Sequence, residues 1–165
     1  MTAIEEEKPM SGITPCLWFD TEAEAAATFY TSVFPRSRVR EVSRYGEAGP
    51  RPAGMVMTVS FELDGRTFTA LNGGPEFTFS EAVSFQVDCK DQGEVDAYWE
   101  ALSEGGEEGP CGWLKDRFGV SWQIVPAALP ELLGDPDRER SQRVMQAMLG
   151  MKKIEIGELE RAAAA

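Results

Sequence analysis

Apolar and polar residues in the first half of the chain follow two periods, and their order predicts a strand, a helix and three further strands. The short apolar run 13–19 predicts a strand, and the alanine-rich segment after Asp20 predicts an amphipathic helix that ends near Pro35. The residues expected on the buried face of this helix are Ala25, Phe29, Val33 and either Ala26 or Tyr30.

Three alternating segments follow the predicted helix. Residues 39–45, 55–63 and 66–71 alternate with the two-residue period of half-buried strands. Asp64 and Gly65 separate the last two segments, and an Asp-Gly pair in this position is a strong local signal for a β-hairpin.

The second half of the chain repeats this order of elements. Residues 83–87 predict a strand, residues 91–102 a helix, and residues 113–115 with 120–125 a final hairpin. A glycine-rich connection at 105–112 precedes that hairpin. The pattern of strand, helix and three strands therefore occurs twice, which predicts an α+β fold built from tandem βαβββ modules.

The residues after Pro126 predict a helical tail. A helix is expected to start near Asp135 and Pro136, and residues 153–165 predict one more short helix. The apolar stripe expected on this tail consists of Val144, Met148, Leu149 and Met151.

Strand alternation also assigns side chains to the two faces of each predicted sheet. The residues expected in the core are Leu17, Phe19, Phe85, Trp99 and Trp122. Those expected on the opposite faces are Cys16, Trp18, Ser84, Gln86 and Trp113. Tryptophan on such a face offers an apolar wall for a planar ligand, although an aromatic side chain on a strand usually belongs to the core.

The amino-acid composition disfavours several classes of binding partner. The chain of 165 residues carries 28 acidic and 16 basic residues, a formal net charge of -12, which disfavours binding to nucleic acid or to an anionic membrane. No apolar run is long enough for a transmembrane helix, and the acidic N-terminal segment does not have the pattern of a signal peptide. The three cysteines are odd in number and far apart, which favours a reducing, cytoplasmic location.

The chain contains no histidine, and this absence removes several kinds of site. A His-anchored zinc or iron site, a Ser-His-Asp triad and a Cys-His dyad all need an imidazole. Carboxylates and carbonyls remain as metal ligands, and these suit magnesium or calcium better than transition metals.

Three segments carry a family resemblance: ITPCLWFD with the FY-x-SVFP that follows it, VSFQVDC with EVD-x-YW-x-AL, and GWLKDRFGVSWQIVP. They resemble the PhnB-like branch of the vicinal-oxygen-chelate (VOC; glyoxalase/bleomycin-resistance) superfamily, whose members often carry the label 3-demethylubiquinone-9 3-methyltransferase. The resemblance covers residues 13–156. It implies two βαβββ modules whose mixed sheets curl into a cup, usually completed in a homodimer, plus a C-terminal helix.

The resemblance also implies a division of the chain. We expect a flexible leader at 1–12, a VOC domain at 13–134 with modules at 13–75 and 82–126, and a helical tail at 135–165. A homodimer is expected because two small sheets otherwise leave open strand edges.

Metal-using relatives hold their ion with a histidine near the start of each first strand and a carboxylate on each last strand. The matching positions in this chain are Thr14, Ala82, Thr69 and Gln123. None of these side chains is an imidazole or a carboxylate, and four lost ligands remove the charge that binds the cation. The resemblance therefore implies a cup without the family's metal, and we expect neither a metal nor another cofactor.

We expect the cup to bind a small, partly aromatic molecule through shape and hydrogen bonds. The candidate binding residues are Cys16, Trp18, Thr69, Ser84, Gln86, Trp113 and Gln123. Two interpretations of Gln123 and Thr69 remain open, because they either orient a ligand or satisfy each other or a buried water.

The sequence leaves two other function classes open. A metal-independent enzyme would use a carboxylate of raised pKa or Cys111, activated by Lys115 or Arg117, although Cys111 is more simply a small apolar filler. The third class is a purely structural role. Methyl transfer is not expected, because Gly73–Gly74 alone does not make the glycine-rich turn that cradles a nucleotide cofactor.

Overall fold

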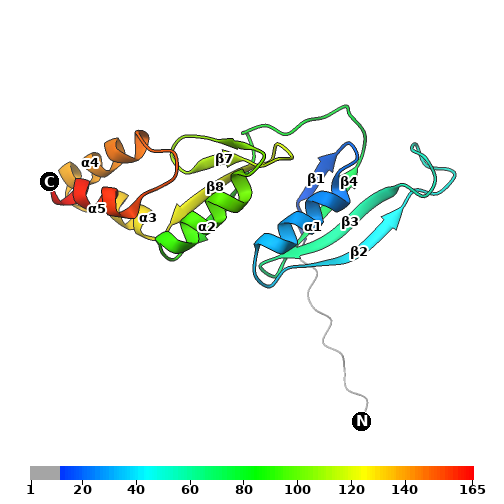
Figure 1. Ribbon diagram of the computed structural model, residues 1–165, viewed down its shortest axis with the longest axis horizontal. Helices are drawn as coiled ribbons and strands as arrows, with labels where there is room; N and C mark the ends of the chain where they lie inside the picture. Colours follow the sequence, from blue (N-terminus) through cyan, green and yellow to red (C-terminus); the bar gives the residue numbers. More distant parts are fainter. Residues whose placement is uncertain (1–11) are drawn as a thin grey trace, which may run out of the picture. The chain divides into compact units, whose positions relative to one another are not determined.

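The computed structural model describes residues 12–165, so the leader expected at 1–12 lies outside the described residues except for Gly12 (Figure 1). The chain divides into two compact units, the first ending at Phe77 and the second running from Thr78 to Ala165. Each unit contains one four-stranded mixed sheet, and the fold is α+β as predicted.

The first unit contains strand β1 (Cys16–Phe19), helix α1 (Ala23–Val33) and strands β2 (Arg38–Arg44), β3 (Val56–Leu63) and β4 (Arg66–Asn72). Its sheet has the order β1-β4-β3-β2. Strand β1 runs parallel to β4, and the other pairs are antiparallel. This is the strand, helix and three strands that the sequence predicts.

Helix α1 packs on one face of this sheet, but with a partly different face from the one predicted. Its buried residues are Ala23, Ala26, Ala27 and Tyr30. Ala26 and Tyr30, the two alternatives for the fourth predicted position, are both buried, but Ala25 is exposed and Phe29 and Val33 are only half-buried, so the predicted face was wrong in part. The prediction followed the largest side chains, whereas the three small alanines allow the helix to lie close to the sheet.

The hairpin between β3 and β4 confirms the local prediction. Asp64 and Gly65 have φ angles of 49° and 76°, and Leu63 pairs with Arg66. Positive φ at both central residues is the geometry of a type I′ turn, whose twist matches that of the flanking strands.

The second unit repeats the pattern with strand β5 (Ser84–Cys89), helix α2 (Gln92–Ser103) and strands β6 (Glu107–Glu108), β7 (Trp113–Lys115) and β8 (Ser121–Pro126). Its sheet has the order β5-β8-β7-β6, with β5 parallel to β8. Strand β6 lies inside the predicted glycine-rich connection. A strand of two residues is too short for an alternating pattern, so β6 has no signal in the sequence.

Helix α2 covers one face of the second sheet. The buried residues between helix and sheet are Val95, Trp99, Leu102, Leu114, Trp122 and Ile124. The core positions predicted for Trp99 and Trp122 are confirmed, since their exposed fractions are 5% and 3%. Phe85 is half-buried, and its ring centroid lies 5.4 Å from that of Trp122.

Three helices complete the second unit: α3 (Ala128–Leu133), α4 (Arg138–Leu149) and α5 (Ile156–Ala164). They share a core of Leu129, Val144, Met151, Ile154 and Leu159. Leu149, which was expected in the apolar stripe, is 61% exposed. It lies five residues after Val144, which places it about 140° away around the helix. No helix among the described residues is long and apolar enough to cross a bilayer.

Candidate functional site

The face of the second sheet opposite α2 collects polar side chains from three strands. We call it the open face, and its side chains are Ser84, Gln86, Trp113, Lys115, Ser121 and Gln123. Their placement follows from register, since Gln86 pairs with Gln123 across the parallel strands and Trp113 pairs with Gln123 across the antiparallel ones. Directly paired residues point to the same face of a sheet.

Gln123 is held by a neighbouring side chain on this face. Its Nε2 donates a hydrogen bond of 2.9 Å to the Oγ of Ser84, on the adjacent strand. Gln86 is more exposed and donates instead to the carboxylate of Asp88, at 2.9 Å. Four of the seven predicted binding residues therefore share the open face, and two of them are directly bonded.

A cavity of about 170 Å³ lies beside strands β6 and β7. We call it the β7 pocket, and its lining residues are Glu81, Glu107, Glu108, Gly109, Pro110, Trp113, Leu114, Lys115 and Ser121. This volume is below the range typical of whole drug-sized ligands, so the pocket suits one ring or one end of a larger molecule.

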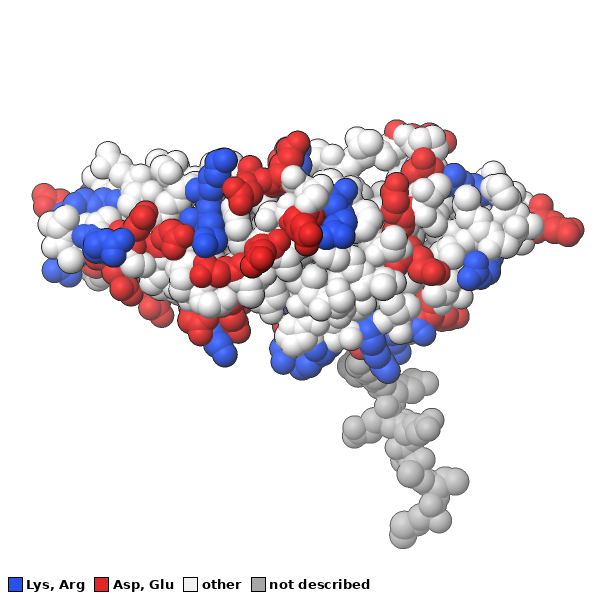
Figure 2. Space-filling model, viewed as in Figure 1, with Lys and Arg blue, Asp and Glu red and all other residues white. Residues whose placement is uncertain are grey.

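The charges of the β7 pocket are unequal. Lys115 forms an ion pair with Glu81, and Glu107 pairs with Lys115 in the strand register. The hydrogen bond from Lys115 lowers the pKa of Glu81, and the same bond raises the pKa of Lys115. Glu108 accepts a hydrogen bond from the indole of Trp99, at 2.9 Å. Among the described residues, the lining therefore contains three acidic residues and one lysine, within a surface where acidic side chains are widespread (Figure 2).

Ser121 is the least exposed polar residue of this pocket. Its exposed fraction is 1%, and its Oγ has no hydrogen-bond partner among the described residues. A buried hydroxyl without a partner is unfavourable, because it has lost water and gained nothing in exchange. Ser121 is not among the residues predicted from the sequence, although the alternation that placed Gln123 on this face places Ser121 there too.

The other three predicted residues lie in the first unit. Cys16 pairs with Thr69 in the parallel register of β1 and β4, and Trp18 lies two residues further along the same strand. The indole Nε1 of Trp18 donates to the carbonyl of Gly74 at 2.9 Å, and its ring contacts Phe77 edge-on. Trp18 is therefore packed against its own unit by specific contacts.

The glycine pair after β4 is explained by this packing. A Cβ atom on Gly73 would lie 2.4 Å from the ring of Trp18, so only glycine fits there. The amides of Gly73 and Gly74 both donate to the carbonyl of Phe19, at 2.9 and 3.4 Å. Since these amides already have an acceptor, the turn does not fit the phosphates of a nucleotide cofactor.

The positions that match the metal ligands of relatives do not form a ligand set. Thr14 and Ala82 precede β1 and β5 and are exposed, while Thr69 and Gln123 carry a hydroxyl and an amide. Among residues 12–165, no group of three or more acidic or cysteine side chains is arranged to hold a metal ion. The donor set therefore does not fit the metal of those relatives.

Cys111 lies at the edge of the second sheet in a left-handed conformation, with φ of 57°. Its amide donates to the carbonyl of Met151 at 2.8 Å, which ties the C-terminal segment to the sheet. The two cations expected to activate its thiol are paired elsewhere: Lys115 with Glu81, and Arg117 with Glu104 at 3.8 Å. These contacts favour a structural interpretation of Cys111.

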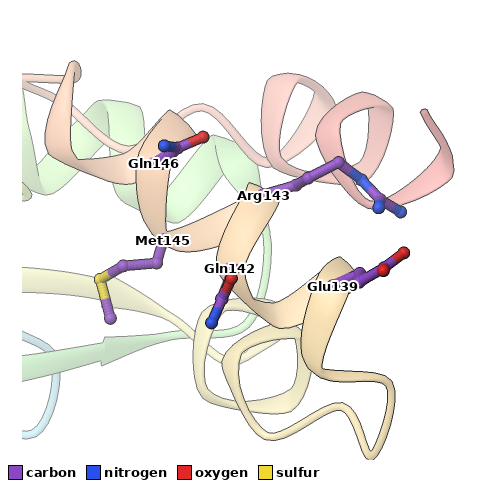
Figure 3. Close-up of a pocket in the computed structure, with 5 residues that line it drawn as sticks. All are labelled: Glu139, Gln142, Arg143, Met145 and Gln146. Carbon is purple, nitrogen blue, oxygen red and sulfur yellow. The ribbon is translucent and has the colours of Figure 1, made fainter.

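A larger cavity, of about 440 Å³, lies beside helix α4 (Figure 3). It is lined by Glu139, Gln142, Arg143, Met145 and Gln146, all from this one helix. The guanidinium of Arg143 points to α5, where it donates to the carbonyls of Ala162 and Ala163, both at 2.9 Å. Because no second element of the described chain brings polar groups to this cavity, the open face remains the better candidate.

Comparison with known proteins identifies relatives of the chain. The 3-demethylubiquinone-9 3-methyltransferase family matches residues 11–125. A PhnB protein from Bacillus cereus is 36% identical, with a TM-score of 0.63, and the match covers 70% of this chain and 99% of that protein. The search of curated proteins finds no match.

Two more distant structures share the fold. Protein PA1353 from Pseudomonas aeruginosa is 21% identical with a TM-score of 0.58, and the match covers 69% of this chain and 96% of that one. The fosfomycin resistance protein FosX from Mesorhizobium loti is 15% identical with a TM-score of 0.54, and the match covers 76% and 99% of the two chains. Helices α4 and α5 lie beyond the part of the chain that the family matches.

Proposed function

Because the chain belongs to the 3-demethylubiquinone-9 3-methyltransferase family, as a PhnB-like member of the VOC superfamily, we propose that it binds a small organic molecule on the open face without a metal ion. The ligand would be partly aromatic, would pack on Trp113 and would accept or donate hydrogen bonds at Gln123, Ser84 and Gln86. Cys16, Trp18 and Thr69 remain proposed binding residues of the first unit.

The observation that supports this proposal most is the hydrogen bond between Gln123 and Ser84. In metal-using relatives the position of Gln123 carries a carboxylate ligand, and here it carries an amide whose orientation is fixed by a neighbour. A primary amide has two donors and one acceptor, and Ser84 uses one donor. The rest of the amide is suited to recognise a polar group without any ion.

The position of Trp113 supports the same proposal. It pairs with Gln123 in the antiparallel register and is half-buried, so an apolar surface adjoins the oriented amide. An apolar wall next to a few fixed polar groups is the common composition of small-molecule sites. No conversion of the ligand is part of the proposal.

The test is a thermal-shift screen of aromatic metabolites, with native mass spectrometry of what copurifies. A ligand of the folded state raises its stability, so at least one compound should raise the melting temperature of the natural chain. Gln123→Ala should reduce that increase, whereas Glu100→Gln, an exposed change on the opposite side of the sheet, should not. Zinc, iron, nickel and manganese should all be well below one ion per chain.

Two results would contradict the proposal. One is a screen in which no compound stabilises the natural chain and nothing copurifies with it. The other is a stoichiometric transition metal that survives dialysis, since the open face would then hold an ion after all.

A further inference from the structure

We infer that the β7 pocket binds the positively charged end of a small aromatic cation, such as an amidine or a protonated amine. The inference rests on the proposed function, because it assigns a chemical class to the ligand of the open face. It depends on three features of the pocket: its excess of carboxylates, its tryptophan wall and its buried hydroxyl without a partner.

The excess of carboxylates sets the sign of the charge that fits. Among residues 12–165, Lys115 is the one cation that lines the β7 pocket, and its ion pair with Glu81 already balances it. Glu107 points to the same face as Lys115, since the two residues are directly paired in the antiparallel register. An anionic ligand would have to displace Glu81 and approach Glu107, whereas a cation gains from both carboxylates.

Trp113 provides the second feature. It stands on the open face between the Gly109–Pro110 segment and Gln123, and it is half-buried. Tryptophan is the best aromatic partner for a cation above its ring and also packs well against a planar group. A flat ligand that carries delocalised positive charge would use both properties.

Ser121 is the independent sign that a ligand group belongs here. Ser121 lines the β7 pocket, the residue is 99% buried, and its hydroxyl has no partner among the described residues. A hydroxyl oxygen accepts a hydrogen bond, so the N–H of an amidinium or ammonium group would satisfy it. The acidic side chains alone would not distinguish a binding site from an ordinary solvated surface.

The test compares three probes of nearly equal shape: benzamidine, benzamide and benzoate, which are cationic, neutral and anionic at pH 7.5. Binding is measured by ¹⁵N-¹H correlation spectra of the whole chain, with the indole signal of Trp113 assigned by Trp113→Phe. Benzamidine should shift this signal and bind about fivefold more tightly than benzamide at low salt, as expected for one exposed ion pair. Benzoate should not bind, and added salt should weaken only benzamidine.

Substitutions test whether the carboxylate of Glu107 and the hydroxyl of Ser121 contact the bound probe. Glu107→Gln should weaken the binding of benzamidine about threefold to fivefold and leave the affinity for benzamide unchanged. Ser121→Ala should weaken both probes, because each can donate to the hydroxyl. Glu100→Gln is the matched control, since it removes one exposed carboxylate from the opposite side of the sheet and should change neither affinity.

Each remaining outcome overturns the inference. If benzoate or benzamide binds as tightly as benzamidine, the pocket does not select a cation, but the proposed function survives. If no probe binds at millimolar concentration, the pocket does not take such a ligand. The proposed function itself then fails only if the metabolite screen is also negative, so the two failures are distinguishable.

Discussion

The side-chain amide of Gln123 donates a hydrogen bond of 2.9 Å to the hydroxyl of Ser84 on the adjacent parallel strand. The first of these residues occupies the position of a carboxylate ligand in metal-using relatives, and the second lies two residues after the position matching their histidine. A pair of neutral side chains therefore joins β5 and β8 next to the positions that the resemblance matches to metal ligands. This pair is the structural basis for expecting metal-free binding.

Restoring a carboxylate at this position should not restore a metal site. In Gln123→Glu the new carboxylate gains no imidazole partner, because the chain has no histidine. A single carboxylate does not supply the three or four ligands that a transition metal requires. After dialysis, Gln123→Glu should hold less than about 0.1 zinc or manganese ions per chain. Plasma mass spectrometry measures this metal content.

The natural chain is the control for that measurement, and both proteins should be dialysed together against excess metal. A stoichiometric ion in Gln123→Glu alone would mean that other groups on the open face complete a coordination shell. That result would contradict the inference that the missing ligands prevent this chain from binding a metal.

The turn before β8 depends on a buried carboxylate. Asp116 is 3% exposed, and its oxygens accept hydrogen bonds from the amides of Phe118 and Val120 and from the indole of Trp122, at 2.8, 3.1 and 2.8 Å. Asp116→Ala should lower the free energy of unfolding by about 3 kcal/mol, because the donors lose their acceptor inside the protein. Urea denaturation followed by tryptophan fluorescence measures this change.

Asp116→Asn should lower the free energy of unfolding less than Asp116→Ala does, since the amide keeps one acceptor for the turn. Glu100→Ala removes an exposed carboxylate and should change stability by less than about 0.5 kcal/mol. Equal, small effects of all three variants would show that Asp116 does not organise this hairpin.

The sequence predicted the strands of the fold better than the details of its helices. Alternation over 55–63 and the Asp64–Gly65 turn are strong local signals, and β3, β4 and the hairpin agree with them. The predicted buried face of α1 was wrong in part, because it depends on how closely the helix approaches the sheet. That distance is set by the small side chains of Ala23, Ala26 and Ala27, which carry little weight in a hydrophobic pattern.

The start of α1 shows a second limit of local reasoning. The segment Asp20-Thr21-Glu22 after β1 has the composition of a helix start, yet the side chain of Glu22 makes no capping hydrogen bond. The amide of Ala23 donates instead to the side-chain oxygen of Asn72, at 2.9 Å and 49 residues away. A cap supplied from another strand has no signature near the helix in the sequence.

Part of the candidate site could be predicted from the sequence. Alternation placed Ser84, Gln86 and Gln123 on one face of the second sheet, and the register of β5 and β8 agrees. The ion pair between Lys115 and Glu81 and the buried hydroxyl of Ser121 were not predicted, because they depend on how the segment before β5 folds over the sheet. The homodimer and the cytoplasmic location stay predictions.

A glutamine side chain fastens the C-terminal segment to α2. The amide nitrogen of Gln92 donates to the carbonyl of Ile154 at 2.9 Å, and its oxygen accepts from the amide of Ile156 at 2.8 Å. Gln92→Ala should lower stability by about 1–3 kcal/mol and leave these two backbone groups without their partner. Hydrogen exchange should accelerate mainly in residues 151–165.

The matched control is Gln142→Ala, which removes an exposed glutamine from α4. It should leave the exchange rates of residues 151–165 unchanged. If Gln92→Ala accelerates exchange no more than this control, then the segment is held by its apolar core and not by the glutamine.

Burial of Cys89 should make the protein less stable in alkali. The thiol is 1% exposed, and burial, followed by the nearby carboxylates of Glu94, Asp88 and Asp91, raises its pKa from the usual 9.0 to about 12. The folded state therefore keeps its proton where the unfolded state loses it. The contribution of Cys89 to the free energy of unfolding is therefore fully present below pH 9 and is lost as the pH rises from 9 toward 12.

Cys89→Ala separates this effect from all other titrations, because the remaining groups are common to both proteins. The difference in unfolding free energy between the natural chain and the variant should be constant from pH 6 to 8, and then fall by at most about 1.4 kcal/mol per pH unit above pH 9. Denaturation by urea under reducing conditions at several pH values measures it. A difference that stays flat up to pH 10.5 would mean that the folded protein ionises Cys89 as easily as the unfolded chain does.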